Sequence, residues 1–292
     1  MLFDQTSLGK FVLKGPDAEA ALNWIAANDM SKPVGSLVYT QMLNDQGGIE
    51  CDLTCVRMAE NEYYSVTGTG FVTHDFDHIS KNIPAGMNAQ LVDVTSAYAV
   101  LSLFGPNARP ILQAITSDDI SNDVLPFGAS KTIDIAGCPV SALRVSYVGE
   151  LGWELHLPTE YAAAVYDAID HAGAIHALRN AGFRAIETLR LEKEFRAWSA
   201  DIGPDHTSFE AGLGFAVKLD TNLAFKGRDA LMAQASDGVK KRMTIFTTAP
   251  GVILLGRETI YRNGVRVGGL VRPGLAIPSA NRLAWALCAA IR

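Results

Sequence analysis

Two carboxylates lie in predicted strands of this sequence, where burying their charge would cost free energy unless a partner or a ligand stabilised it. Asp52 follows a tight Gly-Gly turn and lies between Cys51 and Leu53 in a stretch typical of a β-strand. A buried carboxylate needs a cation or hydrogen-bond donors beside it, so this position favours ligand binding or proton transfer. A strand residue that simply faces solvent is the alternative that the same pattern allows.

Glu154 is the second such carboxylate. It alternates with Trp153 and Leu155, so the predicted strand turns it away from its apolar neighbours. Glu150, four residues earlier, is expected on an exposed turn. A carboxylate can accept two hydrogen bonds from a flat pair of donors, but the pattern alone names no substrate.

Other chemistry has weaker support. His74 and His78 share one face of a predicted helix at a spacing that can hold a metal, but no third ligand accompanies them. Cys51 and Cys55 also lack a second ligand pair, so we predict no metal site and reduced structural thiols. The chain contains no nucleophile-elbow, P-loop or dinucleotide-binding motif, which argues against hydrolase, kinase and Rossmann functions.

An internal sequence repeat predicts that the strands carrying these carboxylates belong to two similar units. The segment FVLKGPDA at 11–18 leads into a predicted helix, and LSLFGPNA at 101–108 does the same about ninety residues later. Each copy is a strand, then Gly-Pro, then a helix whose first turn offers Asp17 or Asn107 as an acceptor for free N–H groups. We therefore predict a structural duplication.

The remaining patterns give the fold class. We expect strands at 36–43, 48–58 and 62–67 with a helix at 73–81, and strands at 130–135, 139–145 and 153–157 with helices at 161–172 and 183–196. A helix at 227–235 and short strands at 241–247, 258–261 and 265–270 predict a small β-barrel or sandwich. The prediction is an α+β chain of two related mixed α/β, ferredoxin-like units at 1–93 and 94–202, followed by a linker and β domain at 203–292.

Composition excludes several partners. The chain has 292 residues, 48% of them hydrophobic, and a net charge of −6 without basic clusters, so nucleic-acid binding is not expected. The sequence has no run of about 18 apolar residues, so we expect no membrane-spanning segment. The start, MLFDQTSLGKF, has neither a basic region nor an apolar core typical of a targeting peptide, so we expect the cytoplasm.

Several segments together resemble the aminomethyltransferase superfamily, which includes the glycine cleavage T-protein and the folate-binding C-terminal parts of dimethylglycine and sarcosine dehydrogenases. They are LFDQTSLGKF, LVYTQMLNDQGGIECDLT, VSYVGELGWELHLP, LRLEKEFRAWSADI and SFEAGLGFAV. The TLRLEK and RAW segments are more similar to the flavin-linked dehydrogenases than to the T-protein. The resemblance implies a C-terminal β-barrel, and units arranged around a central folate cavity.

The resemblance also implies roles for particular residues. Asp52 matches the family's catalytic aspartate, beside the N5 and N10 atoms of tetrahydrofolate, and Glu154 matches the glutamate that pairs with the pterin. Further positions that match the lining of the folate cavity are Tyr147, Tyr39, Val66 and Thr67. The chain departs from the T-protein at Ile186, where that protein has an arginine against the folate.

Both ends of the chain depart from the family pattern. The resemblance implies further residues before Leu2, with FAD only on an N-terminal flavin domain lost from this chain. The resemblance is expected to stop near residue 271. Residues 276–286 can be encoded by synonymous codons whose DNA, read in a shifted frame, gives a family-like glycine-rich segment. We therefore hypothesise a one-base frameshift near residue 271, and expect a tail of about twenty residues that is poorly ordered or that adheres to whatever apolar surface is free.

The expected function is tetrahydrofolate-dependent methylene transfer from a methylated amine or an aminomethyl carrier, giving 5,10-methylenetetrahydrofolate. The chain would be the C-terminal module of a dimethylglycine or sarcosine dehydrogenase. Three alternatives remain open: a T-protein-type aminomethyltransferase, a folate-dependent O- or S-demethylase, and a folate-binding remnant without turnover.

Overall fold

The computed structural model describes residues 1–249, 252, 254–275 and 282–289. Its strands form three antiparallel sheets. The first sheet runs in the order β3 (Leu37–Leu43), β4 (Ile49–Ala59), β5 (Glu62–Thr67), β2 (Gly9–Lys14) and β6 (Gln90–Asp93). The second runs β8 (Ser130–Ile135), β9 (Cys138–Leu143), β10 (Gly152–Pro158), β7 (Tyr98–Phe104) and β1 (Leu2–Asp4).

The two sheets confirm the predicted duplication. Both units have the same order of elements: a strand, a helix, three strands and a second helix, with a further strand at the edge of the sheet. Strands β3, β4, β5 and β2 of the first unit therefore correspond to β8, β9, β10 and β7 of the second. Each unit has one strand more than the βαββαβ pattern of a ferredoxin-like fold. The edge strands differ in origin, because β6 follows its own unit whereas β1 comes from the start of the chain and pairs with β7.

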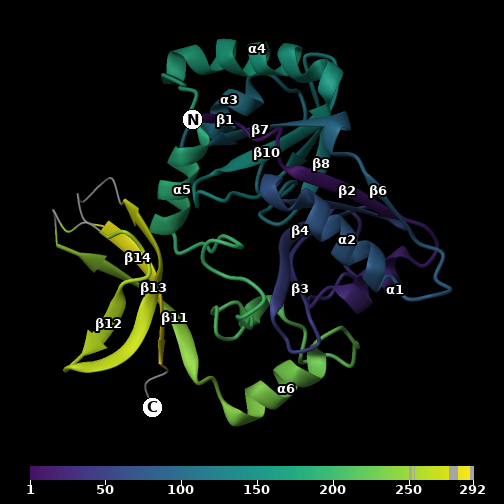
Figure 1. Ribbon diagram of the computed structural model, residues 1–292. Helices are drawn as coiled ribbons and strands as arrows, with labels where there is room; N and C mark the ends of the chain where they lie inside the picture. The colour runs from purple at the N-terminus through teal and green to yellow at the C-terminus, as the bar shows by residue number, and fades with distance from the viewer. Residues whose placement is uncertain (250–251, 253, 276–281, 290–292) are drawn as a thin grey trace.

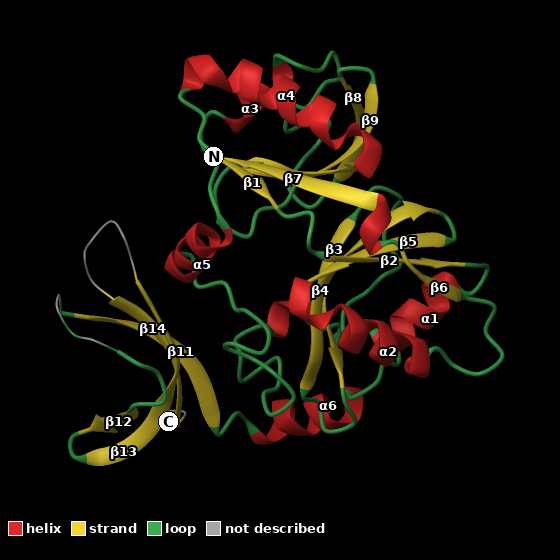
Figure 2. Cartoon of the chain, turned by 45° about the horizontal axis from the view of Figure 1, so that its top comes forward, coloured by secondary structure: helices red, strands yellow, loops and turns green. Residues whose placement is uncertain are grey.

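Helices cover the outer faces of both sheets, so the two units form four layers (Figure 2). These helices are α1 (Ala18–Ile25) and α2 (Val72–Asn82) on the first sheet, with α3 (Ala108–Gln113) and α4 (Ala162–Gly173) on the second. Alternation along the strands sends one set of side chains to the helices and the other toward the opposite sheet. Val56, Tyr64, Val66 and Leu143 form the apolar contact between the two sheets.

Gly15 and Gly105 explain why the repeated Gly-Pro is needed. Their φ angles are +136° and +128°, which side chains rarely adopt, and a Cβ on Gly15 would lie 2.2 Å from a backbone oxygen. The predicted capping is wrong in detail, because neither Asp17 nor Asn107 caps its helix through the side chain. Asp17 instead accepts a hydrogen bond from the backbone N–H of Asn88 at 2.7 Å.

The last part of the chain forms α5 (Phe183–Glu192), α6 (Arg228–Asp237) and a separate sheet in the order β11 (Lys241–Thr248), β14 (Arg282–Ala289), β13 (Val265–Leu275) and β12 (Thr259–Arg262). Figure 1 shows this sheet beside the two units, with α6 below them. Helix α5 ends earlier than the predicted helix at 183–196.

The tail differs from its expectation. Strand β14 pairs with β11 over its whole length and with β13 over residues 282–288, so the expectation of a poorly ordered tail is wrong for residues 282–289. Residues 276–281 and 290–292, on which the same expectation falls, lie outside the described residues. None of the described helices is both long and apolar enough to cross a membrane.

Candidate functional site

The β3–β4 hairpin holds Asp52 between hydrogen-bond donors. Gln41 faces Asp52 across the strand pair, and its Nε2 donates to Oδ1 of Asp52 at 2.9 Å. The hydroxyl of Tyr39 also hydrogen-bonds to this carboxylate. Gln41 is fully buried, and the hydroxyl of Ser208 donates to its Oε1 at 3.4 Å. This contact orients the Gln41 amide so that its Nε2 faces Asp52.

The surroundings of Asp52 change its acidity. Burial raises the pKa of Asp52 to about 6, against the opposing effect of the hydrogen bonds from Gln41 and Tyr39 and of the nearby Arg196 charge, while Asp75 raises it further. A carboxylate with a pKa of about 6 gives up and accepts protons readily near neutral pH. Burial and the Asp52 charge hold the pKa of Tyr39 well above its usual value, so its hydroxyl stays a donor.

The segment between β9 and β10 brings a second aromatic side chain, Tyr147, near Asp52. The hydroxyl of Tyr147 donates to the carbonyl oxygen of Arg196 at 2.6 Å, and the Tyr147 ring stacks on Phe195. Burial raises the pKa of Tyr147, as does the Asp52 charge nearby. Sequence reasoning missed the roles of Gln41 and Arg196. The hairpin register could have revealed Gln41, whereas nothing local places Arg196 beside residue 52.

Glu154 lies on β10 with its side chain 12% exposed. Its neighbour Trp153 is fully buried in the core beneath α3 and α4, so Glu154 points to the opposite face, as predicted. Nε2 of His156 lies 3.4 Å from Oε2 of Glu154, and Nδ1 of His156 lies 3.0 Å from the hydroxyl of Tyr64 on the first sheet.

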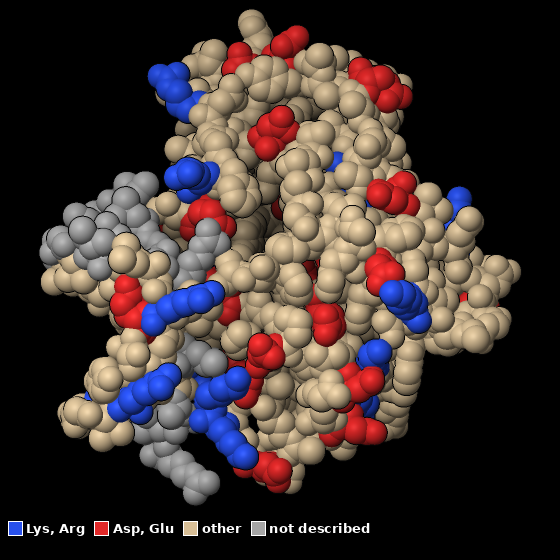
Figure 3. Space-filling view, in the orientation of Figure 1, with Lys and Arg blue, Asp and Glu red and all other residues tan. Residues whose placement is uncertain are grey.

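The structure turns the two carboxylates toward the same space between the sheets. Asp52 and Val56 lie four residues apart on the same face of β4, and Glu154 is the cross-strand partner of Leu143. Val56 and Leu143 both belong to the apolar contact between the sheets, so each carboxylate shares a face with it. The surface seen in Figure 3 is hollowed near the middle of the molecule, with acidic side chains along part of its edge.

The side chains of Val66 and Thr67 lie on opposite faces of the first sheet. Val66 belongs to the contact between the sheets, whereas the hydroxyl of Thr67 donates to Asp75 on α2, beneath the other face of the first sheet. The side chain of Thr67 is therefore engaged away from the space that Asp52 and Glu154 face. Strand alternation explains the difference, since adjacent residues point in opposite directions.

Cys51, His74 and Asp75 form a cluster in which potential metal-ligand atoms lie within 4.8 Å of one another. Asp75 is already satisfied, because it accepts hydrogen bonds from Thr67, from His74 at 2.9 Å and from Cys51. A buried carboxylate with three protein donors is explained as part of the packing between α2 and β4. The four cysteines are free thiols.

Ile186 occupies a core position. It is 3% exposed and packs with Phe3, Phe104 and Val148. Its neighbour Glu187 is an acid and forms an ion pair with Arg190 at 3.1 Å. Ile186 and Glu187 therefore do not supply the cation that the T-protein has against the folate.

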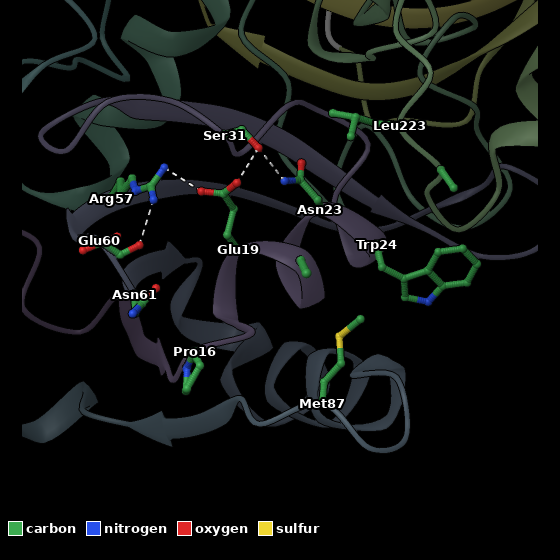
Figure 4. A pocket seen from close by; sticks show the side chains of 12 residues that line it. Pro16, Glu19, Asn23, Trp24, Ser31, Arg57, Glu60, Asn61, Met87 and Leu223 are labelled. Carbon is green, nitrogen blue, oxygen red and sulfur yellow. Dashed lines mark hydrogen bonds and ion pairs between the residues drawn. The ribbon is translucent and has the colours of Figure 1, made fainter.

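An open pocket of about 640 Å³ lies elsewhere, against the outer side of α1 (Figure 4). Its polar lining is held together internally, since Glu19 pairs with Arg57 at 2.7 Å and accepts from Ser31 at 2.8 Å. It contains none of the predicted site residues. We assign the site from the facing carboxylates and not from this recess.

Comparison with known proteins decides the family. Residues 1–221 match the family described as the GCVT N-terminal domain. The chain belongs to this family. Within it, an aminomethyltransferase of Symbiobacterium thermophilum is 33% identical over 276 residues, which cover 92% of this chain and 72% of that protein.

Two relatives with higher identity to this chain are named as dehydrogenases. Human mitochondrial sarcosine dehydrogenase is 41% identical over 298 residues and human mitochondrial dimethylglycine dehydrogenase is 36% identical over 285 residues, each covering 97% of this chain. The greater similarity to these dehydrogenases is as expected. Since 97% of the chain is covered, the similarity continues past residue 271, where we expected it to stop. The chain spans about a third of the length of these relatives (32% and 33%).

The same fold occurs in a solved structure, that of the glycine cleavage system aminomethyltransferase T from Bartonella henselae. It superimposes with a TM-score of 0.85 over 99% of this chain and 78% of that chain. The sequence identity is 24%, so this similarity establishes the fold alone.

Proposed function

We propose that this chain carries out tetrahydrofolate-dependent transfer of a one-carbon unit from a methylated amine, as the C-terminal module of a sarcosine or dimethylglycine dehydrogenase-type enzyme. The observation that carries the proposal is the placement of Asp52 and Glu154 on the facing sides of two sheets. The names of the relatives support it, since an aminomethyltransferase, a sarcosine dehydrogenase and a dimethylglycine dehydrogenase are all similar to this chain. FAD would belong to a separate flavin domain.

The residues present fit a folate. Glu154 is partly accessible, and among the described residues no donor reaches its Oε1 and one long contact reaches its Oε2, which leaves both oxygens able to accept from the paired N–H groups of a pterin. We place the pterin in the space between the sheets, with the Tyr39 and Tyr147 rings and Val66 beside it. We also propose that the C-terminal sheet closes as a barrel, as the family resemblance implies.

Asp52 would act on the nitrogens of the bound folate. When bound, tetrahydrofolate supplies two nitrogens, N5 and N10, that bond to the carbon as the donor amine leaves. The Asp52 carboxylate stabilises the positive charge that develops on these nitrogens and accepts the proton that N10 loses on ring closure. Gln41 and Tyr39 hold Asp52 in place, and the protein keeps both reactants in one site. The carbon would reach the site as an iminium, after a flavin domain removes two electrons from the methylated amine, and the products would then be 5,10-methylenetetrahydrofolate and the demethylated amine.

A chimaeric enzyme tests this function. The chain replaces the matching third of human sarcosine dehydrogenase, and sarcosine is oxidised in the presence of tetrahydrofolate. We expect 5,10-methylenetetrahydrofolate as the product, with free formaldehyde released instead when Asp52→Ala is introduced. Free formaldehyde from the unmutated chimaera, although the chain binds tetrahydrofolate by calorimetry, would reject transfer and leave only folate binding.

Localisation in the cytoplasm remains a prediction. The dehydrogenases are named as mitochondrial proteins, so fractionation of the source cells with an antibody to this chain decides between the compartments.

A further inference from the structure

Three polar side chains form a continuous chain between the two sheets. Tyr64 on β5 is 5% exposed, His156 on β10 is 2% exposed, and Glu154 is 12% exposed. The Tyr64 hydroxyl lies 3.0 Å from Nδ1 of His156, and Nε2 of His156 lies 3.4 Å from Oε2 of Glu154. The first contact has ordinary hydrogen-bond length and the second is longer and weaker.

The chemistry of Tyr64 decides which way the hydrogens point. Burial raises the pKa of Tyr64 far above its usual value, so its hydroxyl keeps its proton. Nδ1 of His156 is the one acceptor that this hydroxyl reaches among the described residues. A buried hydroxyl that did not donate would lose a hydrogen bond, so Nδ1 is the acceptor.

That arrangement fixes the imidazole. A neutral histidine whose Nδ1 accepts carries its hydrogen on Nε2, and Nε2 is the atom that faces Glu154. The opposite tautomer would place the Nε2 lone pair against a carboxylate oxygen, so two acceptors would face each other. The tautomer with hydrogen on Nε2 therefore satisfies all three groups.

We infer that Tyr64 and His156 are positioning residues for Glu154: the hydroxyl of Tyr64 holds His156 in the Nε2–H tautomer, and this N–H orients the carboxylate that binds the ligand. The inference rests on the proposed function, in which Glu154 binds a pterin. It assigns the acceptor sites of the carboxylate, since His156 uses one lone pair of Oε2, and Oε1 together with the second lone pair of Oε2 is left for the two donors of the ligand. It also makes a residue of the first unit part of a site in the second.

Nuclear magnetic resonance tests the hydrogen-bond chain without any ligand. The whole chain is prepared with ¹⁵N-labelled histidine, and the ring of His156 is assigned as the signal that His156→Gln removes. We expect ¹⁵N shifts of a neutral ring with hydrogen on Nε2. In Tyr64→Phe, which removes only the hydroxyl, we expect a mixture of tautomers. A ring with hydrogen on Nδ1, or a charged ring at neutral pH, in the unmutated chain would overturn the inference.

Calorimetric titration with tetrahydrofolate then tests the positioning role. Tyr64→Phe should weaken binding about threefold to tenfold, as expected for one hydrogen bond. Tyr98→Phe is the matched control, because the Tyr98 ring packs edge-on against Tyr64 at 5.7 Å, and this variant should bind as the unmutated chain does. His156→Gln, whose amide can accept from Tyr64 and donate to Glu154, should retain more affinity than His156→Leu.

The outcomes separate the two proposals. If the unmutated chain does not bind tetrahydrofolate, the proposed function fails while the tautomer measurement still stands. If it binds and both Tyr64→Phe and His156→Leu bind equally well, the positioning role is rejected while folate binding is kept. Thermal unfolding of each variant identifies any affinity loss that comes from misfolding, and in that case the tautomer of the unmutated chain decides.

Discussion

The two units have the same strand order but place different chemistry on it. Val12 in the first copy and Ser102 in the second occupy the same place in the repeated strand, and they pair with Tyr64 and Glu154, respectively. A phenol therefore stands in one unit where a carboxylate stands in the other. The comparison teaches that duplication preserved the backbone, while the side chains between the sheets diverged into complementary groups.

Asp52 breaks the symmetry further. Val56 pairs with Tyr64 as Leu143 pairs with Glu154, so the position four residues before each is equivalent. The first unit has Asp52 there and the second has Pro139, which carries no ionisable group. The proposed proton acceptor and the proposed ligand carboxylate thus lie at non-equivalent positions in different units, and the two roles should be separable by mutation.

The largest expected effect is on catalysis in the first unit. Asp52→Asn in the chimaera should lower the rate of 5,10-methylenetetrahydrofolate formation about 10²- to 10⁴-fold, because the proton acceptor is lost. Tetrahydrofolate affinity by calorimetry should change little. Asp77→Asn, an exposed carboxylate on α2 paired with Lys81, is the control. An unchanged transfer rate in Asp52→Asn would remove the distinction between the units.

The next effect is on binding in the second unit. Glu154→Gln should weaken tetrahydrofolate binding about tenfold to a hundredfold, since charge-assisted hydrogen bonds are replaced by an amide that also presents donors to the pterin. At saturating folate the transfer rate should change less than in Asp52→Asn. Equal affinity of Glu154→Gln and the unmutated chain would show that Glu154 is not the ligand carboxylate.

A third effect concerns stability and its pH dependence. The pKa of Asp52 is raised from 3.8 to about 6, so the folded chain binds this proton more tightly than the unfolded chain does. Folding loses stability as pH rises from about 4 to 6, and the loss is complete above pH 6. Asp52→Asn should therefore raise the free energy of unfolding by about 1–3 kcal/mol above pH 6. Urea unfolding should show this gain vanish below pH 4, and a constant difference across the range would contradict it.

The smallest effect is expected at Glu150, the other acidic residue near β10. It is 45% exposed and lies 3.6 Å from an equally exposed Lys193. Glu150→Gln should change the free energy of unfolding by less than about 0.5 kcal/mol and leave folate affinity unchanged, because exposed ion pairs contribute little. A clear loss of affinity would extend the site beyond Glu154.

Local patterns in the sequence predicted much of this structure. Alternation placed Glu154 opposite Trp153, and the repeated Gly-Pro marked the two equivalent strands. The same alternation should have separated Val66 from Thr67, but the resemblance grouped them. What the sequence could not supply were contacts between distant segments: Arg196 beside Asp52, and Tyr64 against His156. Those depend on how the sheets face each other, which no local pattern encodes.

The pairing of β1 with β7 makes the first unit an insertion within the second. The strand that completes the edge of the second sheet leaves the ribosome before any of the first unit, and must wait for β7 to be synthesised. A fragment cut at 93/94 would therefore expose an unpaired edge of β7 to other chains. A circular permutant that joins residues 1–8 to the end of the second unit would instead let each sheet form from one continuous stretch of polypeptide.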